Sequence, residues 1–160
     1  ARAALRPVHP DPGGPAVLLN LLLGVPVMAV CLILQSTLVV FALRFYVNRQ
    51  AKIRDHALGS ALKILTVVML ILIVGNLAQV AAWAALFVVI GEFDELSMAV
   101  YHSAVNFATL GYGDIVMSER HALLGPLESI NGILMVGIST AALMQTFQHA
   151  LRRVLGAPSL

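Results

Sequence analysis

The sequence is poor in charge and in cysteine, and both shortages restrict what it can be. Charged residues make up 11% of its 160 residues and hydrophobic residues 59%, against about 25% and about 45–50% in soluble domains. A soluble fold of this size cannot bury so much apolar surface, and a net charge of +2 offers no basic face for nucleic acid. The single cysteine excludes a disulfide framework and a cysteine-rich metal site. An integral membrane protein remains.

Three apolar segments are long enough to cross a membrane. They run over residues 16–47, 60–90 and 123–151, and each exceeds the roughly 20 residues that a span needs. A fourth segment, residues 96–108, is too short to span, so it is expected to be a re-entrant helix, an interfacial helix or a loop. The sequence therefore predicts an all-α membrane protein with three transmembrane helices.

Basic residues predict the orientation of these spans. A basic linker at 48–59 and a tail at 152–160, with the residues that flank them, place seven basic residues and one acidic residue on one side of the membrane. The other side holds three basic and seven acidic residues. We therefore expect the linker and the tail to be cytoplasmic. A proline-rich, extended N-terminal arm at 1–15 is then outside, and residues 96–108 enter the membrane from that side.

The residues that follow the short segment carry the chemistry. Thr-Leu-Gly-Tyr-Gly-Asp occupies positions 109–114, and Gly111 and Gly113 permit a positive φ at alternate positions. Alternation of right- and left-handed backbone can turn successive carbonyls to the same side. A row of carbonyls without N–H partners is costly in hydrocarbon unless a cation satisfies it. The pattern favours coordination of a dehydrated monovalent cation.

This stretch resembles the selectivity filter of potassium channels, Thr-Val-Gly-Tyr-Gly followed by Asp, with a leucine in place of the valine. The order of outer helix, pore helix, filter and inner helix over residues 60–148 is similar to that family's pore domain. The resemblance implies a homotetrameric pore in a bacterial plasma membrane that conducts K⁺ passively and selectively, without a voltage sensor. K⁺ would be the permeant ion. The residues implied to bind it, through backbone carbonyls and the first residue's hydroxyl, are Thr109, Leu110, Gly111 and Tyr112.

The resemblance also implies groups that support the filter. They are Gly113, Asp114, Tyr101 and His102. Tyr101 and His102 fall where many relatives carry paired aromatic residues, which implies contacts from Tyr101 to Asp114 and from His102 to Tyr112. Simple packing of both side chains is the alternative. Val105 stands where some bacterial relatives carry a glutamate paired with the filter aspartate, so that carboxyl pair cannot form here.

The third span contains the candidate gate. Met-Val-Gly-Ile-Ser-Thr at 135–140 resembles the inner-helix segment that holds the family's hinge. Glycine weakens a helix by roughly 1 kcal/mol relative to alanine, so Gly137 is the hinge candidate, whereas close helix packing is the preferred interpretation of Gly132. The gate candidates are Gly137, Ile138, Ala141, Gln145 and His149. Four copies of His149 would repel one another when charged at low pH, although a histidine at a membrane interface is commonly a solvated anchor.

Three further polar residues lie inside the spans. Asn76 and Gln79 share a helix face and are expected to hydrogen-bond a neighbouring helix. Glu128 lies near the outer end of the third span, and its role stays open between an intramembrane functional carboxylate and a group that reaches the headgroups.

Two other functions compete with a potassium channel. One is a nonselective monovalent cation channel of the same architecture, and the other is a non-conducting membrane subunit used for assembly. An enzyme is not expected, because the spans contain neither a nucleophile–base pair nor a phosphate-binding loop. The expected partners are three identical chains and membrane lipid, and the first helix is free to contact an unidentified regulatory subunit.

Overall fold

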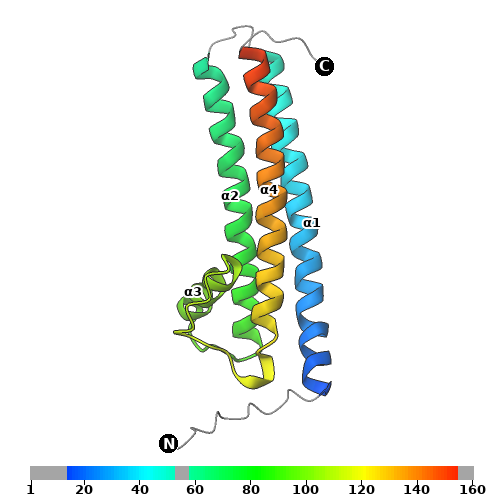
Figure 1. Ribbon diagram of the computed structural model, residues 1–160, viewed down its shortest axis with the longest axis vertical. Coiled ribbons are helices and arrows are strands. Elements are labelled where there is room, and N and C mark those ends of the chain that lie inside the picture. Colours follow the sequence, from blue (N-terminus) through cyan, green and yellow to red (C-terminus); the bar gives the residue numbers. More distant parts are fainter. Residues whose placement is uncertain (1–13, 53–57, 155–160) are drawn as a thin grey trace, which may run out of the picture.

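The computed structural model describes residues 14–52 and 58–154. Its helices are α1 (Gly14–Lys52), α2 (Leu58–Val89), α3 (Leu96–Phe107), the 3-10 turn η1 (Glu119–His121) and α4 (Leu124–Val154). The three long helices α1, α2 and α4 run side by side, and the short α3 lies against α2 and α4 at the end where α1 begins (Figure 1). The predicted all-α architecture is confirmed.

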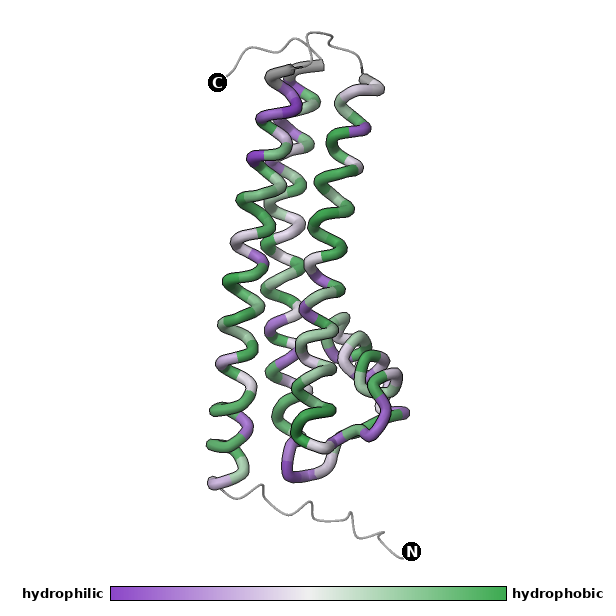
Figure 2. The backbone as a smooth tube through the Cα atoms, turned by 180° about the vertical axis from the view of Figure 1, so that it is seen from behind, coloured by the Kyte–Doolittle hydropathy of each residue, from purple (hydrophilic) through white to green (hydrophobic). Residues whose placement is uncertain are grey.

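The three long helices are long and apolar enough to cross a membrane. Hydrophobic residues cover most of their length, and hydrophilic residues gather near the ends and around α3 (Figure 2). Leu22, Ile33, Val74 and Leu77 are each more than half exposed on the outside of α1 and α2. Helices that are apolar on their outer faces as well as their inner faces are stable where lipid surrounds them.

The ends of the helices differ from the predicted boundaries by a few residues. α1 begins at Gly14, inside the predicted arm, and α2 begins at Leu58, inside the predicted linker. α1 continues through residues 48–52, which were expected to open the linker. Asn-Arg-Gln-Ala-Lys contains neither glycine nor proline, so nothing stops the helix where the apolar run ends. Similarly, α4 continues to Val154, beyond the predicted end at 151. Residues 53–57 of the linker, 155–160 of the tail and 1–13 of the N-terminal arm fall outside the described residues.

Two apolar clusters hold the bundle together. The cluster at the α3 end joins all four α-helices and consists of Cys31, Trp83, Ala84, Phe87, Phe93, Ala99 and Leu124. The cluster at the opposite end joins α1, α2 and α4 and consists of Ala42, Tyr46, Ile64, Leu65, Val68, Leu72 and Ala150. Burial of these side chains fixes α3 and the chain that follows it at one end of a rigid three-helix support.

A layer of hydrogen bonds connects the long helices between these clusters. Gln35 of α1 donates from Nε2 to Ser139 Oγ of α4 at 2.5 Å, and Gln79 of α2 donates from Nε2 to Gln35 Oε1 at 2.7 Å. The prediction for Gln79 is thus confirmed. The prediction for Asn76 fails for its carbonyl, because Asn76 Oδ1 is buried without a partner in the part of the chain that the structure describes. Its side chain lines an apolar hollow between α2 and α4 instead.

Candidate functional site

The segment after α3 leaves the helix through ordinary C-terminal hydrogen bonds. The Ala108 N–H donates to Ala104 O at 3.0 Å, the Thr109 N–H to Asn106 O at 2.8 Å and the Leu110 N–H to Val105 O at 2.9 Å. Over residues 111–114 no further backbone–backbone hydrogen bond forms within the described chain. The strand of residues 109–114, called the filter strand below, therefore begins on a fixed helix end and then loses its internal backbone partners.

The backbone of the filter strand alternates in handedness. φ is 58° at Thr109, 58° at Gly111 and 73° at Gly113, and the residues between them have negative φ. The positive φ predicted for the two glycines is confirmed. The positive φ of Thr109 was not predicted, and a β-branched residue adopts it only under strain. A Cβ added at Gly111 or Gly113 would meet open space, so backbone conformation rather than crowding requires glycine there.

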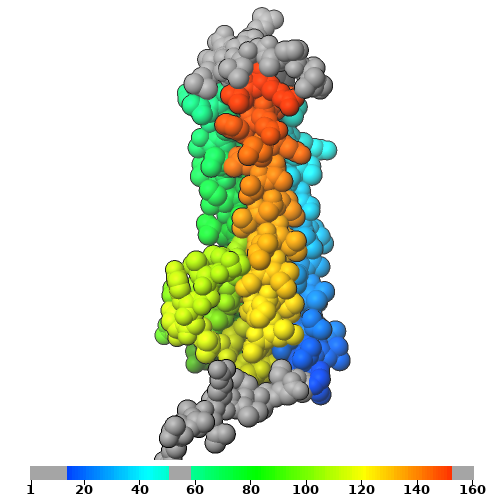
Figure 3. All heavy atoms as spheres, viewed as in Figure 1, coloured from blue at the N-terminus to red at the C-terminus, as the bar shows by residue number. Residues whose placement is uncertain are grey.

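The side chains of the filter strand are uncovered in a single chain. Leu110 is 53% and Tyr112 65% exposed. The strand and α3 stand out from the column of long helices (Figure 3), on the side away from α1. Apolar and aromatic groups of this size are usually covered by a partner when they are exposed together.

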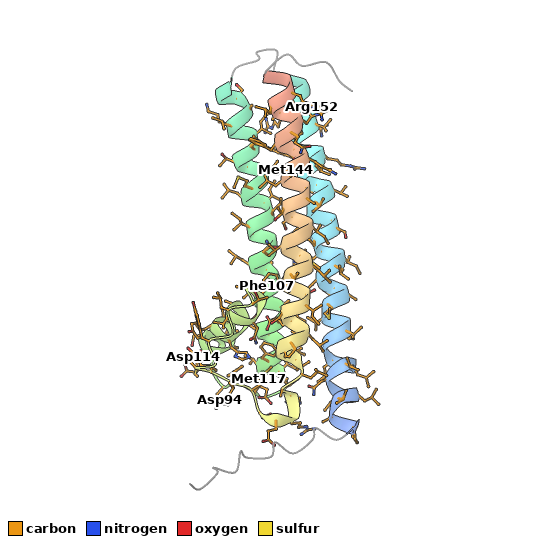
Figure 4. All side chains as sticks on the ribbon, viewed as in Figure 1. Asp94, Phe107, Asp114, Met117, Met144 and Arg152 are labelled. Atoms are coloured by element: carbon orange, nitrogen blue, oxygen red, sulfur yellow. The ribbon has the colours of Figure 1, made fainter. Side chains whose placement is uncertain are left out.

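Asp114 is bound from two directions. Tyr101 Oη donates to Asp114 Oδ2 at 2.7 Å, and the Ile115 N–H donates to Oδ1 at 3.0 Å, so the predicted contact between Tyr101 and Asp114 is confirmed. The Tyr101 hydrogen bond, helped by the Ile115 N–H, holds the pKa of Asp114 below its ordinary value of 3.8. A charged carboxylate therefore faces outward at the end of the filter strand, where Figure 4 labels Asp114 well away from the long helices.

His102 turns inward, and its predicted contact with Tyr112 does not form within the chain. The buried ring packs against Phe87 and Phe93. Nδ1 lies 3.0 Å from Ile115 O, and Nε2 lies 2.9 Å from Asn106 Nδ2. A carbonyl only accepts and an amide nitrogen only donates, so the neutral ring carries its proton on Nδ1. Burial lowers the pKa of His102, which favours this neutral form.

A second outer connection was missed at the sequence level. Glu92, which follows α2, accepts hydrogen bonds from the Ser118 N–H at 2.8 Å, from Ser118 Oγ at 2.5 Å and from His121 Nδ1 at 2.5 Å. Burial alone would raise the pKa of Glu92, but these bonds outweigh it and lower the pKa. They attach the chain beyond the filter strand to the end of α2. No local pattern predicts them, because the partners are 26 and 29 residues away in sequence.

Glu128 lies behind α3 rather than among headgroups. Its side chain is fully buried and contacts the Ser103 hydroxyl of α3. The sequence left its role open, and this burial excludes the headgroup alternative.

The gate candidates do not share one environment. Gly137 has open space beside it, and Ala141 and Gln145 are exposed. Ile138 instead packs against the cluster of Val80, Phe107 and Met135. His149 is exposed, but its ring meets Tyr46 of α1 edge to face at 5.8 Å. Within one chain, α1 therefore lies against the C-terminal end of the α4 face that was expected to line the pore.

A comparison with protein families matches residues 73–149 to a family described as an ion channel. The match covers part of α2, all of α3, the filter strand and most of α4, and it begins beyond α1. No curated protein and no solved structure matches the chain. With three helices fit to cross a membrane, the chain is a membrane protein. Over residues 73–149, just under half of its length, the chain is similar to this ion-channel family.

Proposed function

We propose that the chain is the subunit of a potassium-selective channel, in which four copies surround one axis and the filter strand binds K⁺. The observation that carries this proposal is the alternation of φ at Thr109, Gly111 and Gly113 directly after a short helix. Such a strand can direct its carbonyls to one side, where they replace the hydration shell of the ion. The C-terminal end of α3 carries a partial negative charge that favours a cation nearby.

The exposure of Leu110 and Tyr112 supports a tetramer. One chain supplies one strand, and a ring of carbonyls needs several. Neighbouring copies would cover both side chains, and burial of apolar surface contributes about 25 cal/mol per Å². The exposed apolar side chains on α1 and α2 would then face lipid. The distribution of basic residues places the N-terminus outside, and the resemblance to bacterial potassium channels suggests a bacterial plasma membrane.

Flux through purified, reconstituted protein tests the function. In liposomes with opposed K⁺ and Na⁺ gradients, the reversal potential should follow K⁺, and native mass spectrometry should give four chains. A reversal potential that follows Na⁺ as closely identifies a nonselective cation channel. A folded tetramer without flux under any condition identifies a non-conducting subunit.

Two matched glycine variants locate the pathway. Gly113→Ala forces alanine into a φ of 73° in the filter strand, and Gly91→Ala forces it into a φ of 78° after α2. A Cβ has open space at both positions, so the backbone strain is similar, about 1 kcal/mol. We expect Gly113→Ala to abolish K⁺ selectivity and Gly91→Ala to preserve it. Equal losses in both variants would contradict the assignment of the filter strand.

A further inference from the structure

One face of α4 supports the last turn of α3 directly. Ser129 Oγ donates to Asn106 O at 2.9 Å. A Cβ on Gly132 would lie 2.1 Å from Phe107 O, so the backbone of α4 touches the backbone of the residue that ends α3. Glu128 lies one helical turn before Gly132 on the same face. The start of the filter strand is therefore fixed against this part of α4.

Glu128 adds a polar link between α4, α3 and α2. Ser103 Oγ contacts the Glu128 carboxyl group and lies 2.8 Å from Val80 O. The hydroxyl has one hydrogen and the Val80 carbonyl can only accept it, so both contacts are satisfied when a neutral carboxyl group donates to Ser103 Oγ. No basic side chain pairs with Glu128 in the described ranges, which agrees with a neutral group.

The link continues to the far end of the filter strand. The Asn106 side chain lies near the same carboxyl group, although Glu128 Oε2 is buried without a hydrogen-bond partner in the described chain. Asn106 Nδ2 donates to His102 Nε2 at 2.9 Å. His102 Nδ1 donates to Ile115 O at 3.0 Å. Side chains connected to Glu128 thus hold both the residues before position 109 and the residue after position 114.

We propose that Glu128 is a positioning residue for the filter strand, acting through Ser103 and Asn106 to set where its carbonyls stand. The proposal rests on the function proposed above. Val105, on the same short helix as Ser103, is apolar and cannot form such a link. The carboxyl group on α4 therefore provides the polar anchor behind this filter.

Suitable substitutions at this site can separate an effect on the position of the filter strand from an effect on stability. A leucine at position 128 would fill a similar volume without burying a carboxyl group, and replacing a whole buried polar pair by apolar groups is often neutral or stabilising. Removal of one partner alone leaves the other unsatisfied and destabilises. The double variant Ser103→Ala/Glu128→Leu removes both partners and so tests position with little loss of stability.

The test measures the K⁺/Na⁺ permeability ratio and the thermal stability of the full chain in liposomes and detergent. We expect Glu128→Leu and the double variant to lower the ratio by about tenfold or more. Glu128→Gln should stay near the wild type, because its amide can donate to Ser103 Oγ. Asn131→Leu is the matched control: Asn131 is fully buried on the same helix, and no hydrogen bond joins it to α3 in the described chain.

Each outcome decides one question. An unchanged permeability ratio in an assembled double variant overturns the role of Glu128, and so does an equal loss in Asn131→Leu. A wild type that conducts nothing, or does not discriminate K⁺ from Na⁺, overturns the proposed function instead. If Glu128→Leu does not assemble, Ser103→Ala provides the test, because it removes a single oxygen atom at a helix position that tolerates alanine. A normal permeability ratio in Ser103→Ala overturns the proposal, and a lowered ratio supports it.

Discussion

At the scale of single residues, the filter strand combines strain with support from outside the strand. Thr109 holds a positive φ that its branched side chain disfavours, and the strand makes no backbone–backbone hydrogen bond over residues 111–114 of the described chain. Its far end is instead held by Tyr101 on Asp114 and by His102 on Ile115. Strained backbone persists where the surroundings over-determine it, so these side chains are where substitutions should act.

Removal of the Tyr101 hydroxyl should raise the pH at which K⁺ flux is lost on acidification. Because the folded-state pKa of Asp114 is lowered, the Tyr101 bond to the charged carboxylate is fully present above the ordinary value of 3.8 and is lost as pH falls through the lowered pKa. In Tyr101→Phe the pKa returns toward 3.8, so K⁺ flux should fall at a higher pH than in the wild type. The shift should be small, because solvent screens the interaction between two exposed groups.

The measurement for Tyr101→Phe is K⁺ flux against outer pH. Tyr46→Phe makes the same chemical change in α1, at the opposite end of the bundle, and should leave the acid limb where it is. A Tyr101→Phe profile that coincides with the wild type would mean that the bond to Asp114 does not support the filter strand.

At the scale of elements, α1 is attached to α2 and α4 by hydrogen bonds as well as by apolar packing. Gln35 is fully buried and takes part in two hydrogen bonds, one with each neighbouring long helix. A Cβ on Gly75 would lie 2.5 Å from Leu38 Cδ1, so glycine on α2 lets α1 approach closely. Ser139 follows the hinge candidate Gly137 by two residues, which places the α1 attachment beside the point where α4 is expected to bend.

Gln35→Leu should loosen this attachment. The substitution leaves Gln79 Nε2 without its partner, whereas Ser139 keeps its bond to Met135 O at 2.9 Å. Interhelical hydrogen bonds in membranes contribute about 0.6 kcal/mol on average and up to about 1.7 kcal/mol, so a loss of about 1 kcal/mol in the free energy of unfolding is expected. Addition of Gln79→Leu should recover part of it, because both partners are then apolar.

Denaturant unfolding in detergent provides the measurement for Gln35→Leu, with Thr37→Val as the control. Thr37 is on the same helix, but its hydroxyl donates to Ile33 O within α1 at 2.8 Å and is exposed. Equal destabilisation by the two substitutions would show that the interhelical bonds of Gln35 contribute no more to the free energy of unfolding than a hydroxyl bonded within α1.

At the scale of the whole molecule, the sequence predicts features that depend on neighbouring residues, whereas contacts between residues distant in sequence become visible only in the fold. The three spans could be predicted from the lengths of the apolar runs. The positive φ of Gly111 and Gly113 could be predicted from their alternate positions in the filter strand. The partners of Glu92, Gln35 and Glu128 could not be predicted, because each lies more than 20 residues away in sequence. Their presence had a signal, a polar residue within or beside an apolar run, but its partner depends on how the helices pack.

The same division explains why the filter strand is uncovered in a single chain. α3 is fixed by α2 and α4, yet Leu110, Tyr112 and the carbonyls of the filter strand have no cover or partner from the described chain. Neighbouring copies would supply the cover, and a bound cation would supply the partner for the carbonyls.

If the proposed function holds, the tetramer should therefore be stabilised by K⁺ and not by Na⁺. A ligand that binds only the folded assembly stabilises it by RT ln(1 + [L]/Kd), about 2.7 kcal/mol at a concentration of one hundred times Kd. Melting of the tetramer at constant ionic strength, with Na⁺ replaced stepwise by K⁺, should show a rising midpoint in the wild type. The rise should disappear in Gly113→Ala and persist in Gly91→Ala, because only the first changes the carbonyls of the filter strand. Equal stabilisation by both cations would mean that the strand does not distinguish them, and the nonselective channel would then be the better description.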